Sequence, residues 1–258
     1  DKKYKGTSPT FGTAMSPVVW NETLYAHVGT DGDGAMTAFD AKTGNEKWTW
    51  KGDGPAYSSP IIATIGGVAQ LVTQSEKNVI GLDASSGQLL WKIPFTTPYT
   101  QNSVTPFVTG DTVIYSGLEN GITAIRIARE GAVWKTANLW QTKEVSLYMN
   151  SPVVKGDFLC GMSHRNRGQY FCLNKTTGKT VWTSPGRQAE NAALILAGDW
   201  LVSLEDDGEL LVMPASGAQF KQEKRYAAAQ SATWAHPAFI PGGIVIKDFD
   251  SLSFLSLQ

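Results

Sequence analysis

The sequence predicts an all-β fold, a β-propeller of four-stranded antiparallel blades. Trp48, Trp91 and Trp134 recur at intervals of 43 residues. Short apolar runs separated by turns lie between these markers, no amphipathic helix pattern interrupts them, and 26 glycines among 258 residues suit many tight turns. A repeat of about 40 to 45 residues that holds four short strands is typical of a propeller blade. We therefore expect about six blades in this chain.

Each repeat is predicted to contain the same strands in the same order. The first strand follows a Ser-Pro or Thr-Pro pair, and its proline recurs at Pro17, Pro60, Pro106 and Pro152. A Gly-Asp turn, such as Gly110-Asp111, leads to the second strand, and a polar loop leads to the third. A glycine turn then leads to the fourth strand, which carries the tryptophan. The apolar runs are 5 to 7 residues long, which is strand length and too short for helices.

The predicted blades form a single domain over residues 1–258. Their expected ranges are 16–58, 59–104, 105–150, 151–190, 191–235 and 236–258, and residues 1–15 complete the last blade. The last unit is short by one strand, which leaves two alternatives open. The chain is either a closed six-bladed ring, in which the N-terminal segment covers the open sheet edge, or part of an eight-bladed ring.

Composition and charge exclude several classes of protein. Lysine and arginine total 22 against 23 acidic residues, so a net charge of -1 gives no basic surface for a nucleic-acid backbone. No apolar stretch approaches the ~20 residues that a membrane-spanning helix needs. The first residues lack the apolar core of a signal peptide, and we expect a chain from which a signal peptide has been removed.

The glycine turn and its tryptophan form a recurring motif. Residues 38–48 read AFDAKTGNEKW, residues 81–91 read GLDASSGQLLW, and residues 172–182 read CLNKTTGKTVW. These segments resemble the A-x-D-x-x-T-G-x-x-x-W tryptophan-docking repeat of the PQQ-like β-propellers, and the resemblance covers essentially the whole chain. The copy that ends at Trp134 lacks the Asp-Thr pair, and the copy that ends at Phe220 lacks the tryptophan. The resemblance implies that tryptophans pack on neighbouring blades and that glycines form the turns: Trp48, Trp91, Trp134, Trp182, Gly44, Gly87 and Gly178.

The resembling family contains both enzymes and scaffolds. Its quinoprotein alcohol dehydrogenases bind pyrroloquinoline quinone between a tryptophan and two adjacent cysteines, with calcium or a lanthanide held by carboxylates. The two cysteines of this chain, Cys160 and Cys172, are twelve positions apart. A second branch is the periplasmic propeller lipoprotein of the outer-membrane assembly machinery, which is a non-catalytic scaffold. Together with the uncharacterised binding propellers, it is the group that this chain resembles most.

Polar and aromatic residues in the predicted loops are the candidates for a ligand-binding site. In propellers, the loops before the first strand and between the second and third strands gather at one face. The candidates for this face are Tyr57, Tyr99, Asn102, Tyr148, Asn150, His164, Arg165, Arg167, Glu190, Asn191, Trp234 and His236. Acidic residues in the second set of loops are Asp31, Asp33, Glu76, Glu119, Asp206, Asp207, Asp248 and Asp250. The alternative is that these hairpin tips are simply solvated.

Two of these loops have a more specific chemical pattern. Residues 164–167 read HRNR, the densest cationic cluster, and arginines bind carboxylate or phosphate through two parallel hydrogen bonds. Residues 31–34 read DGDG, which resembles the start of a calcium loop but lacks the later ligands of an EF-hand. Solvated turns are the alternative for both. No catalytic residues and no metal site are assigned, because no nucleophile elbow, HExxH, P-loop or dinucleotide motif is present.

The two cysteines suggest a disulfide bond. If the loop between their strands is centred on Asn166, Cys160 and Cys172 lie opposite one another in an antiparallel pair. Their Cβ atoms would then be about 4.5–5.5 Å apart, close to the distance that a disulfide needs. The alternative is a pair of buried thiols that pack as small apolar side chains.

The resemblance and the residues together lead to one expected function. We expect an extracytoplasmic, periplasmic propeller that acts as a binding or assembly scaffold without catalysis, with a protein, a peptide or a small ligand as partner and no cofactor. One alternative is a quinoprotein-like dehydrogenase that binds pyrroloquinoline quinone and calcium. Another is a structural subunit of a larger membrane-associated complex.

Overall fold

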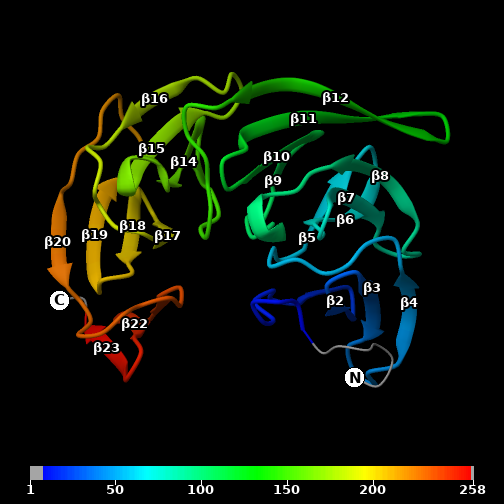
Figure 1. The fold of residues 1–258 in the computed structure, drawn as a ribbon, viewed down its shortest axis with the longest axis horizontal. Coiled ribbons are helices and arrows are strands. Elements are labelled where there is room, and N and C mark those ends of the chain that lie inside the picture. Colours follow the sequence, from blue (N-terminus) through cyan, green and yellow to red (C-terminus); the bar gives the residue numbers. More distant parts are fainter. Residues whose placement is uncertain (1–7, 257–258) are drawn as a thin grey trace. The chain divides into compact units, whose positions relative to one another are not determined.

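The computed structural model describes residues 8–256, and β-strands form most of it (Figure 1). The strands form six antiparallel sheets, five of four strands and one of three, as expected for propeller blades. The chain divides into two compact units, Asp1–Gln141 and Thr142–Gln258. Two short 3-10 segments are also present, η1 (Pro98–Thr100) and η2 (Arg165–Arg167). Within residues 8–256 no helix has the length and apolar character needed to cross a membrane.

The first unit contains three sheets. The first sheet is β1 (Val18–Trp20), β2 (Thr23–Thr30), β3 (Asp33–Asp40) and β4 (Glu46–Trp50). The second is β5 (Ile61–Ile65), β6 (Val68–Gln74), β7 (Asn78–Asp83) and β8 (Leu89–Pro94). The third is β9 (Phe107–Thr109), β10 (Thr112–Gly117), β11 (Gly121–Glu130) and β12 (Val133–Thr142), whose last residue crosses the unit boundary.

The second unit contains the other three sheets. The fourth sheet is β13 (Val153–Lys155), β14 (Phe158–Ser163), β15 (Gln169–Asn174) and β16 (Thr180–Thr183). The fifth is β17 (Ala192–Ala197), β18 (Trp200–Glu205), β19 (Glu209–Pro214) and β20 (Lys224–Ala227). The sixth has three strands, β21 (Ala238–Ile240), β22 (Gly243–Lys247) and β23 (Leu252–Ser256).

Apolar cores lie between neighbouring sheets within each unit. In the first unit, Tyr25 and Met36 of the first sheet pack with Leu71 and Ile80 of the second. A separate cluster joins the second sheet to the third. In the second unit, corresponding clusters join the fourth sheet to the fifth and the fifth to the sixth. A sheet with neighbours on both sides buries both faces of its central strands, so most residues of β6 and β7 are buried, including the polar Gln70, Thr73 and Gln74.

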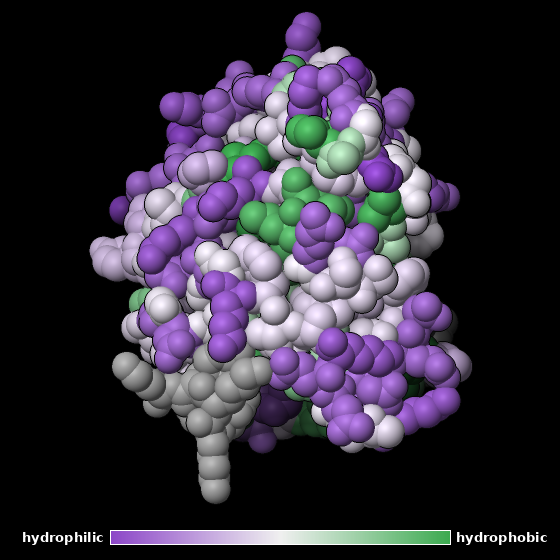
Figure 2. All heavy atoms as spheres, turned by 90° about the vertical axis from the view of Figure 1, so that its right-hand side faces the viewer, coloured by the Kyte–Doolittle hydropathy of each residue, from purple (hydrophilic) through white to green (hydrophobic). Residues whose placement is uncertain are grey.

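The outer surface is polar by comparison. Figure 2 shows one face of the molecule, on which hydrophilic and neutral residues surround a smaller hydrophobic patch. The outermost strand of the third sheet, β12, is mostly exposed, and Val133 and Leu139 on it are exposed apolar residues. Isolated exposed apolar residues of this kind are common on soluble domains.

The hairpin between the third and fourth strands is fixed by one side chain in three of the sheets. The Oδ1 atom of Asp40 accepts hydrogen bonds from the backbone N–H groups of Lys42 and Thr43 and from the Thr43 hydroxyl. Asp83 and Asn174 occupy the same place in their turns and accept the same two backbone bonds, together with a hydroxyl bond from Ser85 and from Thr177, respectively. The glycine that follows each turn has a positive φ of 71° to 74°, at Gly44, Gly87 and Gly178, a conformation that disfavours any side chain.

The four motif tryptophans make different contacts. Trp48 of the first sheet donates its indole N–H to the Ala84 carbonyl of the second sheet at 3.1 Å. Trp91 donates to Gln70 of its own sheet at 2.7 Å and belongs to the cluster shared with the third sheet. Trp134 of the third sheet lies beside Gly66 of the second sheet, and the Arg129 guanidinium lies over its ring. Trp182 of the fourth sheet packs against Phe220, which lies in the loop between β19 and β20 of the fifth sheet.

Part of the predicted domain plan lies outside the described residues. Residues 1–15 were expected to complete the last blade, and of these only residues 8–15 are described, where they form no strand. The closed six-bladed ring, the eight-bladed ring and the single-domain organisation therefore stay predictions.

Candidate functional site

The predicted ligand-binding residues divide between the two units. Tyr57, Tyr99 and Asn102 lie in the first unit, and the other nine lie in the second. Each unit therefore has its own set of loops, and they differ in how many polar groups are free to meet a ligand.

Two of the three candidate asparagines, Asn102 and Asn150, are committed to the fold. Asn102 is fully buried, and its amide N–H₂ group donates to the carbonyls of Ser75, Glu76 and Phe95. Asn150 forms a two-way pair with the backbone of Met162, donating at 2.8 Å and accepting at 3.1 Å. A buried amide must have its hydrogen bonds satisfied, and both do so with backbone groups of their own unit. We therefore assign them a structural role in place of the expected contact with a ligand.

The acidic loop residues of the first unit are also engaged within the protein. Glu76 is 8% exposed and accepts a hydrogen bond from the Gly32 N–H at 2.8 Å. Asp31 accepts bonds from the backbone and hydroxyl of Thr10. Asp53, which the sequence did not single out, accepts from Ser75, Lys77 and Asn78. These carboxylates hold the loops together.

The aromatic candidates have more free surface. Tyr99 is 80% exposed and has a left-handed backbone with φ of 59°, and Trp234 is 63% exposed. Tyr57 is partly buried and accepts a hydrogen bond from the Phe11 N–H at 3.1 Å. Tyr148 lies edge-on to His164, with ring centroids 6.4 Å apart. Glu190 and His236 are exposed, and the Asn191 carbonyl accepts from Asp206 at 3.0 Å.

A buried polar network in the second unit was missed by sequence reasoning. Glu205, at the end of β18, is fully buried and accepts a hydrogen bond from the Tyr170 hydroxyl at 2.8 Å. Tyr170 in turn lies 2.7 Å from the hydroxyl of Ser203, and Arg225 approaches the second oxygen of Glu205 at 3.4 Å. The only hint in the sequence is the acidic run EDDGE at residues 205–209, which is indistinguishable from a solvated hairpin tip until its partners are known.

Burial changes the acidity of this network. Removal from water raises the pKa of Glu205 from 4.5 to about 7, and the Tyr170 hydroxyl and Arg225 oppose that rise. Burial, together with the nearby Glu205 carboxylate, raises the pKa of Tyr170 well above 10. In the first unit, burial lowers the pKa of His27 from 6.5 to about 4, so this imidazole is neutral at pH 7.

One group of carboxylates is close enough together to bind a metal ion, among the residues that the structure describes. The ligand oxygens of Glu205, Asp207 and Glu209 lie within 4.8 Å of one another. Arg225 forms ion pairs with both Glu205 and Glu209, so a guanidinium already supplies positive charge to this cluster. We assign no metal to it.

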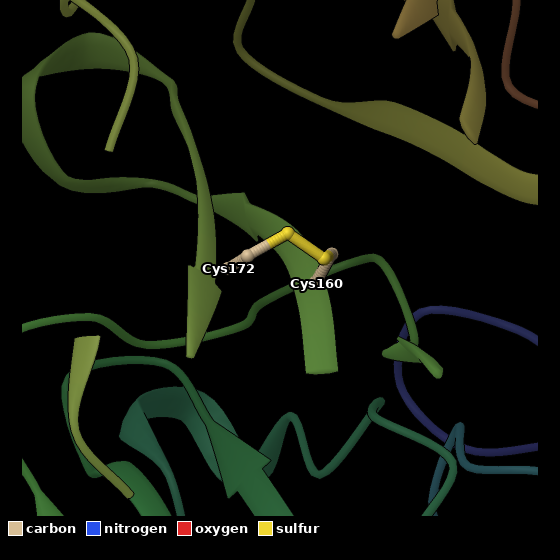
Figure 3. The surroundings of a disulfide bond; sticks show 2 residues. All are labelled: Cys160 and Cys172. Carbon is tan, nitrogen blue, oxygen red and sulfur yellow. A yellow bond between two sulfur atoms is a disulfide. The ribbon is translucent and has the colours of Figure 1, made fainter. Parts of the chain in front are cut away.

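The cysteines are joined in a disulfide inside the fourth sheet. Cys160 of β14 and Cys172 of β15 are paired residues in the ladder, with Cα atoms 4.1 Å apart (Figure 3). Both are buried in the cluster that contains Tyr170 and Trp182. Cysteines enclosed in a blade core offer no sulfur surface on which a quinone ring could lie. The residues present do not fit the pyrroloquinoline quinone site of the dehydrogenases.

The η2 loop groups the cationic candidates. Arg165 and Arg167 are exposed at the tip between β14 and β15. A cavity of about 380 Å³ beside them is lined by Asn166, Arg167, Gly186 and Arg187. Arg187 was not among the predicted site residues, because it follows the fourth strand and meets Arg167 only through the folding of two separate loops.

Comparison with known proteins places this architecture in a family. The model of the PQQ_2 family, described as outer membrane protein assembly factor BamB, matches residues 5–184. The outer membrane protein assembly factor BamB of Bordetella pertussis is 21% identical, and the alignment covers 97% of this chain and 68% of that protein.

Solved structures show the same fold at low identity. BamB from Moraxella catarrhalis is 14% identical with a TM-score of 0.53, over 93% of this chain and 81% of that one. The computationally designed Ika8 protein is 12% identical with a TM-score of 0.69, over 98% and 73% of the two chains. A chain of the mitotic checkpoint complex is 14% identical with a TM-score of 0.61, over 92% and 71%. The BamB family model matches more than two thirds of the residues of this chain, and the chain therefore belongs to the BamB family of PQQ-like β-propellers.

Proposed function

We propose that this protein is a non-catalytic, extracytoplasmic propeller that binds protein partners and serves as a scaffold in the assembly of outer-membrane proteins. The observation that carries the proposal is the match of the BamB family model to residues 5–184, together with a BamB relative that aligns with 97% of the chain. Sequence identity of 21% fixes the fold more firmly than the activity, so the site chemistry must be consistent with the proposal as well.

The site chemistry favours binding over catalysis. The buried polar candidates Asn102 and Asn150 bond to backbone groups, and the carboxylates of Glu76 and Asp53 bind loop N–H groups. The groups with free surface are aromatic side chains and arginines, of which Tyr99 is the most exposed aromatic among the candidates. Aromatic and arginine side chains are the types enriched where proteins bind one another.

The disulfide supports a location outside the cytoplasm. Disulfides persist in oxidising compartments such as the bacterial periplasm and are rare in the cytosol. The Cys160–Cys172 bond is part of the buried core of the fourth sheet. A scaffold exposed to the periplasm benefits from a covalent link that reduces the entropy of its unfolded chain.

The test is fractionation and co-purification in the native host. A tagged full chain is expected in the periplasmic or outer-membrane fraction and should co-purify, after cross-linking in intact cells, with the β-barrel assembly proteins of that host. Deletion of the gene should lower the amounts of outer-membrane β-barrel proteins. A cytoplasmic location, or unchanged outer-membrane protein levels with no assembly protein captured, would overturn the proposal. A tagged periplasmic protein of unrelated fold is the control for non-specific capture.

A further inference from the structure

We infer that the η2 tip of the fourth sheet is a docking site for an acidic segment of a partner protein, held by Arg167 and Arg187 with Arg165 beside them. This inference rests on the proposed scaffold function and assigns a chemistry to its partner.

Residues 158–189 carry no acidic side chain. This stretch holds five cationic residues in a chain whose overall net charge is -1: Arg165, Arg167, Lys175, Lys179 and Arg187. The two lysines lie in the turn between β15 and β16, at the end of β15 opposite the arginines. The three arginines thus lie at the η2 end of the fourth sheet, and the two lysines lie at its opposite end.

No carboxylate of the described residues forms an ion pair with these three arginines. The ion pairs of the second unit involve Lys155, Lys175, Lys221 and Arg225. Two carboxylates at the acidic tip of the neighbouring fifth sheet, Glu205 and Glu209, are paired with Arg225. The positive charge of the η2 tip is therefore left for an external anion.

The two loops that carry the arginines are fixed to each other by backbone hydrogen bonds. The Arg187 N–H donates to the Asn166 carbonyl at 2.9 Å, and the Gln188 N–H donates to the Gly168 carbonyl at 3.1 Å. The Gln169 side chain donates to the Ser184 carbonyl at 2.6 Å and accepts from Asn166 at 2.9 Å. Because both loops are held together in this way, Arg167 and Arg187 emerge at the same cavity with their backbones already positioned.

The backbone at this cavity is strained. Asn166, Arg167 and Arg187 have positive φ values of 54°, 59° and 62°, in the left-handed region that non-glycine residues seldom adopt. Gly168 and Gly186 allow the close contact, because a side-chain carbon on Gly186 would lie 2.6 Å from the Asn166 carbonyl oxygen. Strain of this kind persists where the surrounding structure over-determines it, and it occurs often at binding sites.

Arginine forks match the geometry of a carboxylate. Each guanidinium donates two parallel hydrogen bonds to such a group, and two guanidinium groups at one cavity would hold successive acidic side chains of an extended segment. The carboxylate is the anion that an unmodified protein partner presents. The cavity of about 380 Å³ is open to an incoming side chain and is lined by four residues only, which suits a peptide surface better than an enclosed small ligand.

The experiment measures peptide binding by the purified full chain. A fluorescent, glutamate-rich extended peptide and its glutamine counterpart are titrated by fluorescence polarisation at low and high salt. The protein should bind the glutamate peptide at least about tenfold more tightly, and more weakly as salt rises. Equal affinity for the two peptides, or displacement of the acidic peptide by equimolar inorganic phosphate, would overturn the inference.

Charge-matched variants locate the site. Arg167→Gln with Arg187→Gln should weaken binding of the acidic peptide by about tenfold or more. Lys175→Gln with Lys179→Gln removes the same charge from the same sheet at its opposite end and should change affinity by less than about twofold. An equal loss in both double variants would show a general charge effect and contradict the assignment. Arg167→Lys with Arg187→Lys keeps the charge without the forks and should give an intermediate loss, in a chain whose melting temperature is unchanged.

The outcome is separable from that of the proposed function. If the Arg167→Gln/Arg187→Gln variant restores outer-membrane protein levels fully in the deletion strain, the docking site is wrong and the scaffold function stands. If the wild-type chain binds the acidic peptide at this tip while deletion has no effect on outer-membrane proteins, the scaffold function is wrong and the site stands.

Discussion

Glu205 is the last residue of β18, in the second unit. The carboxyl is fully buried, and burial raises its pKa from 4.5 to about 7. The protonated form is therefore favoured in the folded chain, and its stabilising effect is complete below pH 4.5. The effect is lost as the pH rises through about 7, because the unfolded chain ionises freely while the folded chain resists ionisation. At 1.36 kcal/mol per pKa unit, the loss amounts to about 3 kcal/mol.

The perturbation is Glu205→Gln, which resembles the protonated acid and still accepts the Tyr170 hydrogen bond. The measurement is urea unfolding of both proteins at several pH values from about 5 to 8.5, followed by tryptophan fluorescence. The wild-type chain should lose about 3 kcal/mol relative to the variant across this range. Asp207→Asn, an exposed acid of the same hairpin, is the control and should keep most of the wild-type slope. Parallel pH profiles for the wild type and Glu205→Gln would refute the reasoning.

Three further predictions concern packing, the disulfide and a buried histidine. Gly87→Ala should destabilise the chain by roughly 2 kcal/mol more than Gly44→Ala. Both glycines have φ above 70°, but only a Cβ at Gly87 would meet an indole ring, at 2.5 Å. Urea unfolding compares the two variants, and equal losses of stability would contradict this packing. Replacing Cys160 and Cys172 by alanine should lower the free energy of unfolding by about 3 kcal/mol. Alkylation of the wild-type chain, followed by mass measurement, checks the bond itself, and two free thiols would exclude it. Burial lowers the pKa of His27 to about 4, so the stability present above pH 6.5 should fall as the pH drops toward 4. His27→Gln should lose that acid sensitivity in the same unfolding assay. If the variant loses stability below pH 6.5 as the wild type does, His27 is not the cause.

Periodicity made the blades predictable. The recurring tryptophans, glycine turns and short apolar runs predicted all-β blades, and the structure has six antiparallel sheets in the predicted order, the last with three strands. Local sequence determines such hairpins because the Asp40 and Asp83 side chains bond to backbone groups two and three residues further on. These interactions need no distant partner.

The candidate site was predictable only in part. Loop positions placed Arg165 and Arg167 at one hairpin tip, as expected from their sequence. Loop position did not distinguish them from Asn102, which looks equally polar in the sequence and is fully buried in the structure. Whether a polar side chain is free or committed depends on carbonyls contributed by other strands, and a single sequence does not show which carbonyls these are.

The sequence by itself determined the repeat, the turn chemistry, the count of sheets and the acid-free cationic stretch of the fourth sheet. The tertiary structure decided which polar side chains are bonded inside the protein and which remain exposed to a ligand. Glu205 meets Tyr170 from the neighbouring sheet, and Arg187 meets Arg167 from a separate loop, in both cases across gaps of twenty residues or more along the chain. Hairpin geometry is local and is determined by short motifs, whereas burial and electrostatic pairing depend on packing between sheets. The contacts of the candidate site therefore form only when the chain is folded.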